Sequence, residues 1–111
     1  MTNKFRVLIS ELNQRTKSDN SLWEKTIGEN CIETFFSTYG LRICKYSESG
    51  KTMIYLSVLD LNGSSIEDIS VSELKDKIEF RSLLETFEIA KEKLLSELDN
   101  VLDAIINEIR Q

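Results

Sequence analysis

Histidine and proline are both missing from this 111-residue sequence. Histidine is the commonest general base near neutral pH and a frequent zinc ligand, so its absence excludes Ser-His-Asp and Cys-His catalysis and most zinc sites. Glycine occurs only four times. Each of the four glycines stands at a turn position, so no glycine-rich phosphate-binding loop is present. We therefore expect no enzyme activity, no catalytic residue, no metal site and no cofactor.

Long hydrophobic runs and clusters of basic residues are missing as well. No apolar run approaches the roughly 18–20 residues of a membrane span, and we do not expect the first residues to act as a signal peptide. The net charge is −5, and residues 65–111 hold twelve of the nineteen acidic residues. A phosphate-binding surface needs clustered Lys and Arg. We expect a cytoplasmic protein that binds neither membrane nor nucleic acid, with an acidic inhibitor that mimics DNA as a minor alternative.

The hydrophobic pattern predicts one α+β domain over residues 1–111. A helical stripe that runs from Phe5 to Leu12 predicts an N-terminal helix over 4–17. Four turn sequences then separate short segments rich in aromatic and β-branched residues, which predicts an antiparallel meander of four to five strands. The expected strands are 22–27, 31–38, 41–47, 52–61 and 65–70. Asn62-Gly63 is the strongest turn signal, because both residues tolerate the positive φ of a type I′ turn.

Two of these turns predict how the strands pair. A two-residue turn at Tyr39-Gly40 places Phe36 opposite Ile43, and one at Ser49-Gly50 places Ile43 opposite Leu56. All strands then share one apolar face, which we expect to be the core. Its members are Trp23, Ile27, Ile32, Phe36, Leu41, Ile43, Ile54, Leu56 and Val58.

The opposite face of the predicted sheet is mixed and aromatic, as interface cores often are. It supplies our candidate interaction surface, made of Phe35, Arg42, Tyr46, Met53, Tyr55 and Leu59. On the predicted register, Phe35, Cys44 and Tyr55 form one row across the strands. The N-terminal helix is the alternative cover for this face, and it would leave no surface for a partner.

The sequence contains two cysteines, Cys31 and Cys44. On the predicted register they are offset by four residues, roughly 13 Å along the strands, beyond the ~7 Å limit between the Cα atoms of a disulfide. We expect two reduced and partly buried thiols.

Apolar residues recur at threes and fours from Ile78 to Ile109 and predict a C-terminal helix. An unbroken helix over 78–110 would be about 50 Å long, whereas five strands span only about 20–25 Å. We expect a break near Ser96–Asn100. The alternative is an unbroken helix whose overhang packs on another chain, which would make the protein a homodimer.

Acidic residues are frequent, but the sequence does not force any two of them to converge. Asp60 with Glu67 or Asp68 could hold a divalent metal beside the Asn62-Gly63 turn, although an Asp at such a turn usually bonds to the turn itself. Glu88 and Glu92 alternate with lysines and indicate a solvated helix face. A small enzyme that uses acids and a divalent metal is therefore the alternative to our main interpretation.

Three features of the sequence resemble a group of small bacterial and mobile-element proteins that have no assigned activity. They are a W-E-x-T strand at Trp23–Thr26, a hairpin at Tyr55–Gly63 and the C-terminal helix. In the hairpin, Leu56, Val58, Asp60 and Gly63 follow a Y-x-L-x-(I/V)-x-D-x-x-G pattern, with Tyr55 one position later than the pattern's Tyr. The resemblance implies a bacterial origin and no mechanism. We predict a non-catalytic protein-interaction or regulatory module, whose partner is another protein or a second copy of itself.

Overall fold

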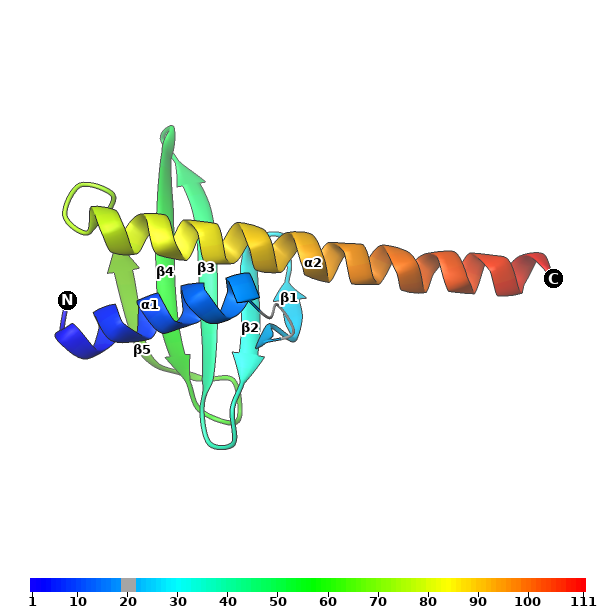
Figure 1. Cartoon of the computed structure of the whole chain (residues 1–111), viewed down its shortest axis with the longest axis horizontal. Helices are drawn as coiled ribbons and strands as arrows, with labels where there is room; N and C mark the ends of the chain where they lie inside the picture. Colours follow the sequence, from blue (N-terminus) through cyan, green and yellow to red (C-terminus); the bar gives the residue numbers. More distant parts are fainter. Residues whose placement is uncertain (19–21) are drawn as a thin grey trace.

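The computed structural model describes residues 1–18 and 22–111 and has the α+β architecture expected from the sequence. A single antiparallel sheet is arranged as a meander in the order β1-β2-β3-β4-β5, with one helix before it and one after it (Figure 1). The elements are α1 (Asn3–Ser18), β1 (Lys25–Ile27), β2 (Cys31–Phe35), β3 (Gly40–Glu48), β4 (Lys51–Leu59), β5 (Ser65–Val71) and α2 (Lys77–Arg110).

The hairpin between β3 and β4 forms with the predicted register. Ile43 lies opposite Leu56, and Leu41 lies opposite Val58. Ser49 and Gly50 both have positive φ, 50° and 76°, as a two-residue type I′ turn requires. This turn type was expected at Asn62-Gly63, where only Gly63 has positive φ. There the Asp60 carboxylate accepts hydrogen bonds from the backbone N–H groups of Asn62 and Ser64 and shapes a longer loop.

The predicted register of β2 is wrong by four residues. Ile32, not Phe36, lies opposite Ile43, because β2 ends at Phe35 and residues 36–39 form the connection to β3. A shift of four residues keeps each β2 side chain on its predicted face, because side chains alternate with a period of two. Phe36, however, lies outside the sheet in the connection to β3, and 49% of its surface is exposed. Ile27 pairs with Cys31 and therefore points to the opposite face from the one predicted.

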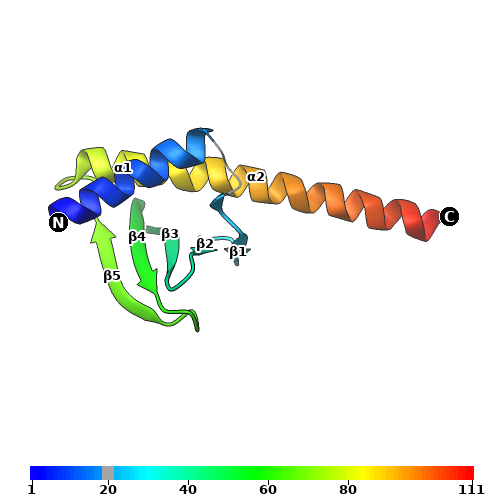
Figure 2. The same cartoon turned by 60° about the horizontal axis from the view of Figure 1, so that its bottom comes forward.

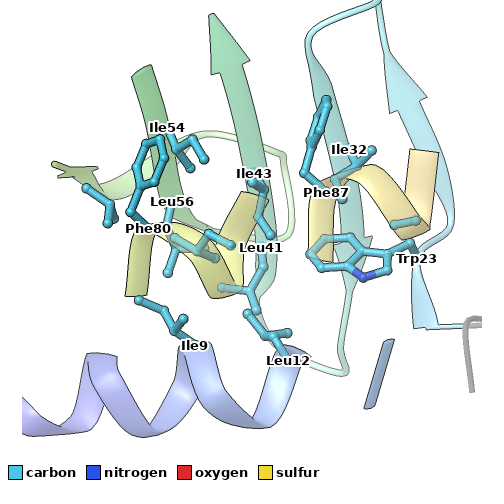
Figure 3. Packing of buried hydrophobic residues seen from close by; sticks show 13 residues of the cluster. Ile9, Leu12, Trp23, Ile32, Leu41, Ile43, Ile54, Leu56, Phe80 and Phe87 are labelled. Atoms are coloured by element: carbon cyan, nitrogen blue, oxygen red, sulfur yellow. The ribbon is translucent and has the colours of Figure 1, made fainter. Parts of the chain in front are cut away.

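Both helices lie on the same side of the sheet and cross its strands (Figures 1 and 2). The alternative in which α1 covers the other face is therefore wrong. Ile9 and Leu12 of α1 and Phe80 and Phe87 of α2 belong to one buried cluster over the predicted core face (Figure 3). The confirmed buried members of that face are Trp23, Ile32, Leu41, Ile43, Ile54 and Leu56, with Val58 partly buried against them.

Trp23 joins α1 to the sheet. Its ring is 3% exposed and lies beside Ile32 and Phe87 in the core, and its indole N–H donates to the hydroxyl of Thr16, 2.9 Å away. The carbonyl of Leu22 accepts a hydrogen bond from the hydroxyl of Thr34 on β2, at 2.6 Å. These bonds satisfy polar groups in and beside the core, so Trp23 serves as a packing anchor.

Helix α2 is continuous over 34 residues, and the predicted break near Ser96–Asn100 does not occur. At 1.5 Å per residue the helix is about 51 Å long, and the longest dimension of the molecule is 55 Å. The first half of α2 covers the sheet, and the second half extends beyond β1 with no other element of the described chain beside it (Figure 1).

Candidate interaction surfaces

The projecting half of α2 exposes an apolar stripe, which we call the α2 stripe. Seven aliphatic side chains that would ordinarily be buried each expose between 41% and 78% of their surface. They are Leu95, Leu98, Val101, Leu102, Ile105, Ile106 and Ile109. Single exposed apolar side chains are common on soluble monomers, but a contiguous apolar patch of this size often marks an interaction site. The α2 stripe is therefore the strongest candidate for a contact with another molecule.

The spacing of the α2 stripe is that of a helix-pairing seam. Its central residues, Leu95, Leu98, Leu102, Ile105 and Ile109, are separated by three, four, three and four positions. A mean spacing of 3.5 residues is the repeat of the a and d positions of a coiled coil, which pack into a facing helix. The polar residues Ser96, Asn100 and Asp103 lie on the other side of the helix and are exposed. The α2 stripe therefore fits another helix.

A groove runs between the first part of the α2 stripe and the edge strand β1. Its volume is about 290 Å³. Leu94, Leu98 and Val101 form its apolar wall, while Glu24 and Lys25 line the β1 side. Because β1 is at the edge of the sheet, nothing from the described part of the chain closes the far side of this groove.

The helix-free face of the sheet carries a polar row that reaches from one edge to the other. Direct cross-strand neighbours form it in the order Lys25, Glu33, Arg42, Ser57 and Asp68. The Glu33 carboxylate is only 3% exposed and accepts hydrogen bonds from Nε and a terminal nitrogen of Arg42, at 2.7 and 2.6 Å. Asp68 accepts a hydrogen bond from the hydroxyl of Ser57. These bonds link the row into two pairs, Glu33 with Arg42 and Ser57 with Asp68.

The pKa of Asp68 is lower than its ordinary value of 3.8. The main cause is the hydrogen bond from Ser57, with a second from Ser65 and a weaker contribution from the charge of Arg42. Hydrogen bonds to a carboxylate favour its charged form. The row therefore keeps a negative charge at its β5 end.

The six residues of the predicted interaction surface all lie on this helix-free face, as their pairings require. Tyr46 is 39% exposed, and its ring contacts that of Tyr55 edge-on, with centroids 6.1 Å apart. Phe35, Arg42, Met53 and Tyr55 are partly buried. Leu59 is fully buried and cannot contact a partner directly. The use of this face as an interaction surface stays a prediction.

The two cysteines form a disulfide, which corrects the expectation of two free thiols. Cys31 lies directly opposite Cys44 in the observed register, with Cα atoms 4.1 Å apart. The predicted row of Phe35, Cys44 and Tyr55 is wrong for the same reason, because Cys31 takes the place given to Phe35. Cys44 is therefore unavailable as a nucleophile while the disulfide is intact.

Several acidic residues form contacts with their own turn or with a neighbouring element. Asp60 bonds to its own turn, and Glu88 on α2 forms an ion pair with Lys45 of β3, with a nitrogen–oxygen distance of 2.5 Å. Glu85 of α2 pairs with Lys17 of α1 at 2.7 Å. Among the described residues, no three His, Cys, Asp or Glu side chains are grouped so that they could hold a metal ion. Within the same residues, no helix is long and apolar enough to cross a membrane.

Comparison of the chain with known protein families, with curated proteins and with solved structures finds no match. The resemblance to small bacterial and mobile-element proteins therefore stays a prediction. The arguments about function that follow depend on the geometry of this chain alone.

Proposed function

We propose that this protein is a non-catalytic protein-interaction or regulatory module that forms a homodimer through the α2 stripe. The observation that carries the proposal is the exposure of seven aliphatic side chains on a helix that extends beyond its own sheet. No other element of the described chain shields them from water. A partner that covers them would gain the free energy of burying apolar surface.

The size of the α2 stripe supports a dimer. From the exposed fractions of its seven side chains, it presents about 600 Å² of apolar surface. This area is at the upper end of the size range of the largest apolar patch on typical monomers. Pairing two such stripes would bury about 1,200 Å² in total, at the lower limit of a specific protein–protein interface. Burial of the groove beside β1 would add to this area.

The chemistry of the α2 stripe favours a second helix over a lipid surface. Helices that lie on membranes carry Lys and Arg on their polar face. Here the polar side of residues 95–110 holds the acidic residues Glu97, Asp99, Asp103 and Glu108, against the single basic residue Arg110. A second copy of the chain supplies a matching seam with the same 3.5-residue spacing, and symmetric dimers are the commonest oligomers.

Other parts of the proposal follow from charge and redox chemistry. The acidic balance of α2 disfavours nucleic acid as a partner. We place the protein in the cytoplasm, where disulfides are rare because thiols are kept reduced. In that compartment Cys31 and Cys44 would be a thiol pair, ready to form the observed disulfide upon oxidation.

The molar mass in solution, measured by light scattering at micromolar concentration, tests the proposal. We expect about twice 12.8 kDa for the natural sequence. A variant with Leu98→Glu and Ile105→Glu should have the mass of a monomer and keep the cooperative unfolding of the sheet and its covering helices, because both positions are exposed within one chain and lie outside the core.

Leu74→Glu is the matched control. Leu74 is 91% exposed but lies before α2, at the end remote from the α2 stripe, so this variant should remain dimeric. A monomeric natural protein, or a double variant that stays dimeric, would overturn the proposal.

A further inference from the structure

The geometry points to an antiparallel arrangement of the two α2 helices, in which the last turns of the partner's α2 lie in the groove beside β1. This inference rests on the proposed dimer. It adds which segment of the second copy occupies the groove and where the two sheets lie in the assembly.

The first step is that the α2 stripe continues the side of the helix that covers the sheet. Phe80, Leu83, Phe87 and Ala90 are buried against the sheet or α1. Steps of four, four and three residues lead from Ala90 through Leu94 and Leu98 to Val101, so the apolar side continues with no change of face. The stripe therefore faces the space next to the β1 edge, on the sheet side of α2.

The second step excludes a parallel pair. In a parallel pair, residues 77–94 of the partner helix would run beside residues 77–94 of this chain, on its apolar side. The sheet and α1 already fill that space (Figure 2). An antiparallel partner enters from the open end of α2 instead, so that only the projecting halves overlap and both sheets are accommodated.

The third step is the match between side chains along the seam. In an antiparallel coiled coil, a positions of one helix meet d positions of the other. With this alignment Leu98 meets Ile109 of the partner subunit, and Leu102 meets Ile105 of the partner subunit. The twofold symmetry repeats both contacts. Every layer is aliphatic, so no polar group is buried without a partner.

The fourth step is the fit at the groove. The alignment brings the partner's last turns to the wall formed by Leu94 and Leu98 beside β1. Glu24 and Glu97 provide two carboxylates there, and the partner's Arg110 arrives with a positive charge. Lys25 also lines the groove, but its ammonium group belongs to the polar row, 3.8 Å from the Glu33 carboxylate, so the charge match at the groove comes from the two carboxylates.

The arrangement determines what the dimer presents. The two sheets lie at opposite ends of the paired helices, and the twofold axis turns their helix-free faces in opposite directions. A dimer of this kind offers two separate copies of the face that carries Tyr46, Met53 and Tyr55.

A distance between two spin labels tests the orientation in the full-length protein. Arg81 lies on α2 and is exposed. In the Arg81→Cys variant it provides the only free thiol, because Cys31 and Cys44 are bonded to each other. The antiparallel alignment separates the two labels by about 65–70 Å along the helices, whereas a parallel pair places them within about 30 Å of each other.

Light scattering on the labelled sample separates the two ways in which the inference can fail. A dimer mass with the long distance supports the antiparallel arrangement. A dimer mass with the short distance overturns the antiparallel arrangement and leaves the proposed dimer standing. A monomer mass with no distance between labels overturns both.

Discussion

Cys31 on β2 and Cys44 on β3 lie directly opposite each other, with their Cα atoms 4.1 Å apart and their sulfur atoms bonded. The bond joins two central strands at a point between the polar row and the Tyr46–Tyr55 ring pair. The connection from β2 to β3 is a four-residue loop, which constrains the pairing less tightly than the two-residue turn between β3 and β4. The disulfide therefore fixes a register that the loop alone does not.

Reduction of this disulfide should destabilise the protein. The bonded residues are 13 positions apart, and closure of a loop of about this size contributes about 3 kcal/mol. Urea unfolding followed by circular dichroism should show this loss of unfolding free energy when a reductant is added. The Cys31→Ala, Cys44→Ala variant is the control and should unfold identically with and without reductant. An unchanged midpoint for the natural protein would show that no disulfide closes this loop in solution.

Leu56→Ala should cost about 2–5 kcal/mol of unfolding free energy, because it leaves a cavity at a fully buried position between both helices and the sheet. Leu61→Ala makes the same chemical change at a side chain that is 61% exposed. It should change stability by less than about 0.5 kcal/mol. Chemical denaturation of the two variants side by side measures the difference. Equal effects would contradict the observed burial of Leu56.

The agreement between sequence and structure depends on local signals. The β3–β4 register was predictable because Ser49-Gly50 forms a turn of two residues, which fixes the pairing. The β2 register was not, because nothing in the sequence shows that Tyr39-Gly40 belongs partly to a longer loop. The disulfide was missed as a direct result, since only the corrected register brings Cys31 to Cys44.

Local sequence signals also predicted only part of the candidate sites. The comparison of helix length with sheet width gave the overhang of α2 only as the alternative to a break. The mixed face of the sheet followed from alternation. The predicted helix break gave too much weight to the polar residues Ser96 and Asn100. They lie on the exposed side of α2, where polar residues are compatible with a continuous helix. The polar row required the register of all five strands, which local patterns do not provide.

Ser57→Ala should raise the pKa of Asp68 toward its ordinary value, because the hydrogen bond from Ser57 is the main cause of the depressed pKa. The folded pKa lies below the unfolded one, so the charged carboxylate stabilises the fold at pH values above the unfolded pKa. This contribution is lost as the pH falls through the folded pKa. Titration of the Asp68 carboxyl carbon by NMR measures the shift.

Ser47→Ala is the control for this titration, because Ser47 lies at the far end of β3 and makes no contact with the Asp68 carboxylate. The substitution should leave the pKa of Asp68 where it is. If Ser57→Ala left it unchanged as well, the hydrogen bond at the β5 end of the polar row would not exist in solution.

The projecting half of α2 should depend on dimerisation for its protection from hydrogen exchange. Within one chain, residues 95–110 form a helical segment that packs against no other element of the described chain. Isolated helices of about this length are marginal in water. In the Leu98→Glu, Ile105→Glu variant, their amides should exchange at least about tenfold faster than in the natural protein, as expected for a segment that opens locally.

Residues 80–90 should exchange equally slowly in both proteins, because their burial comes from the sheet and α1. Hydrogen exchange read out by mass spectrometry on overlapping peptides separates the two segments. Equal protection of residues 95–110 in both proteins would mean that the helix is stable without a partner, and the case for a paired α2 would then rest on molar mass alone.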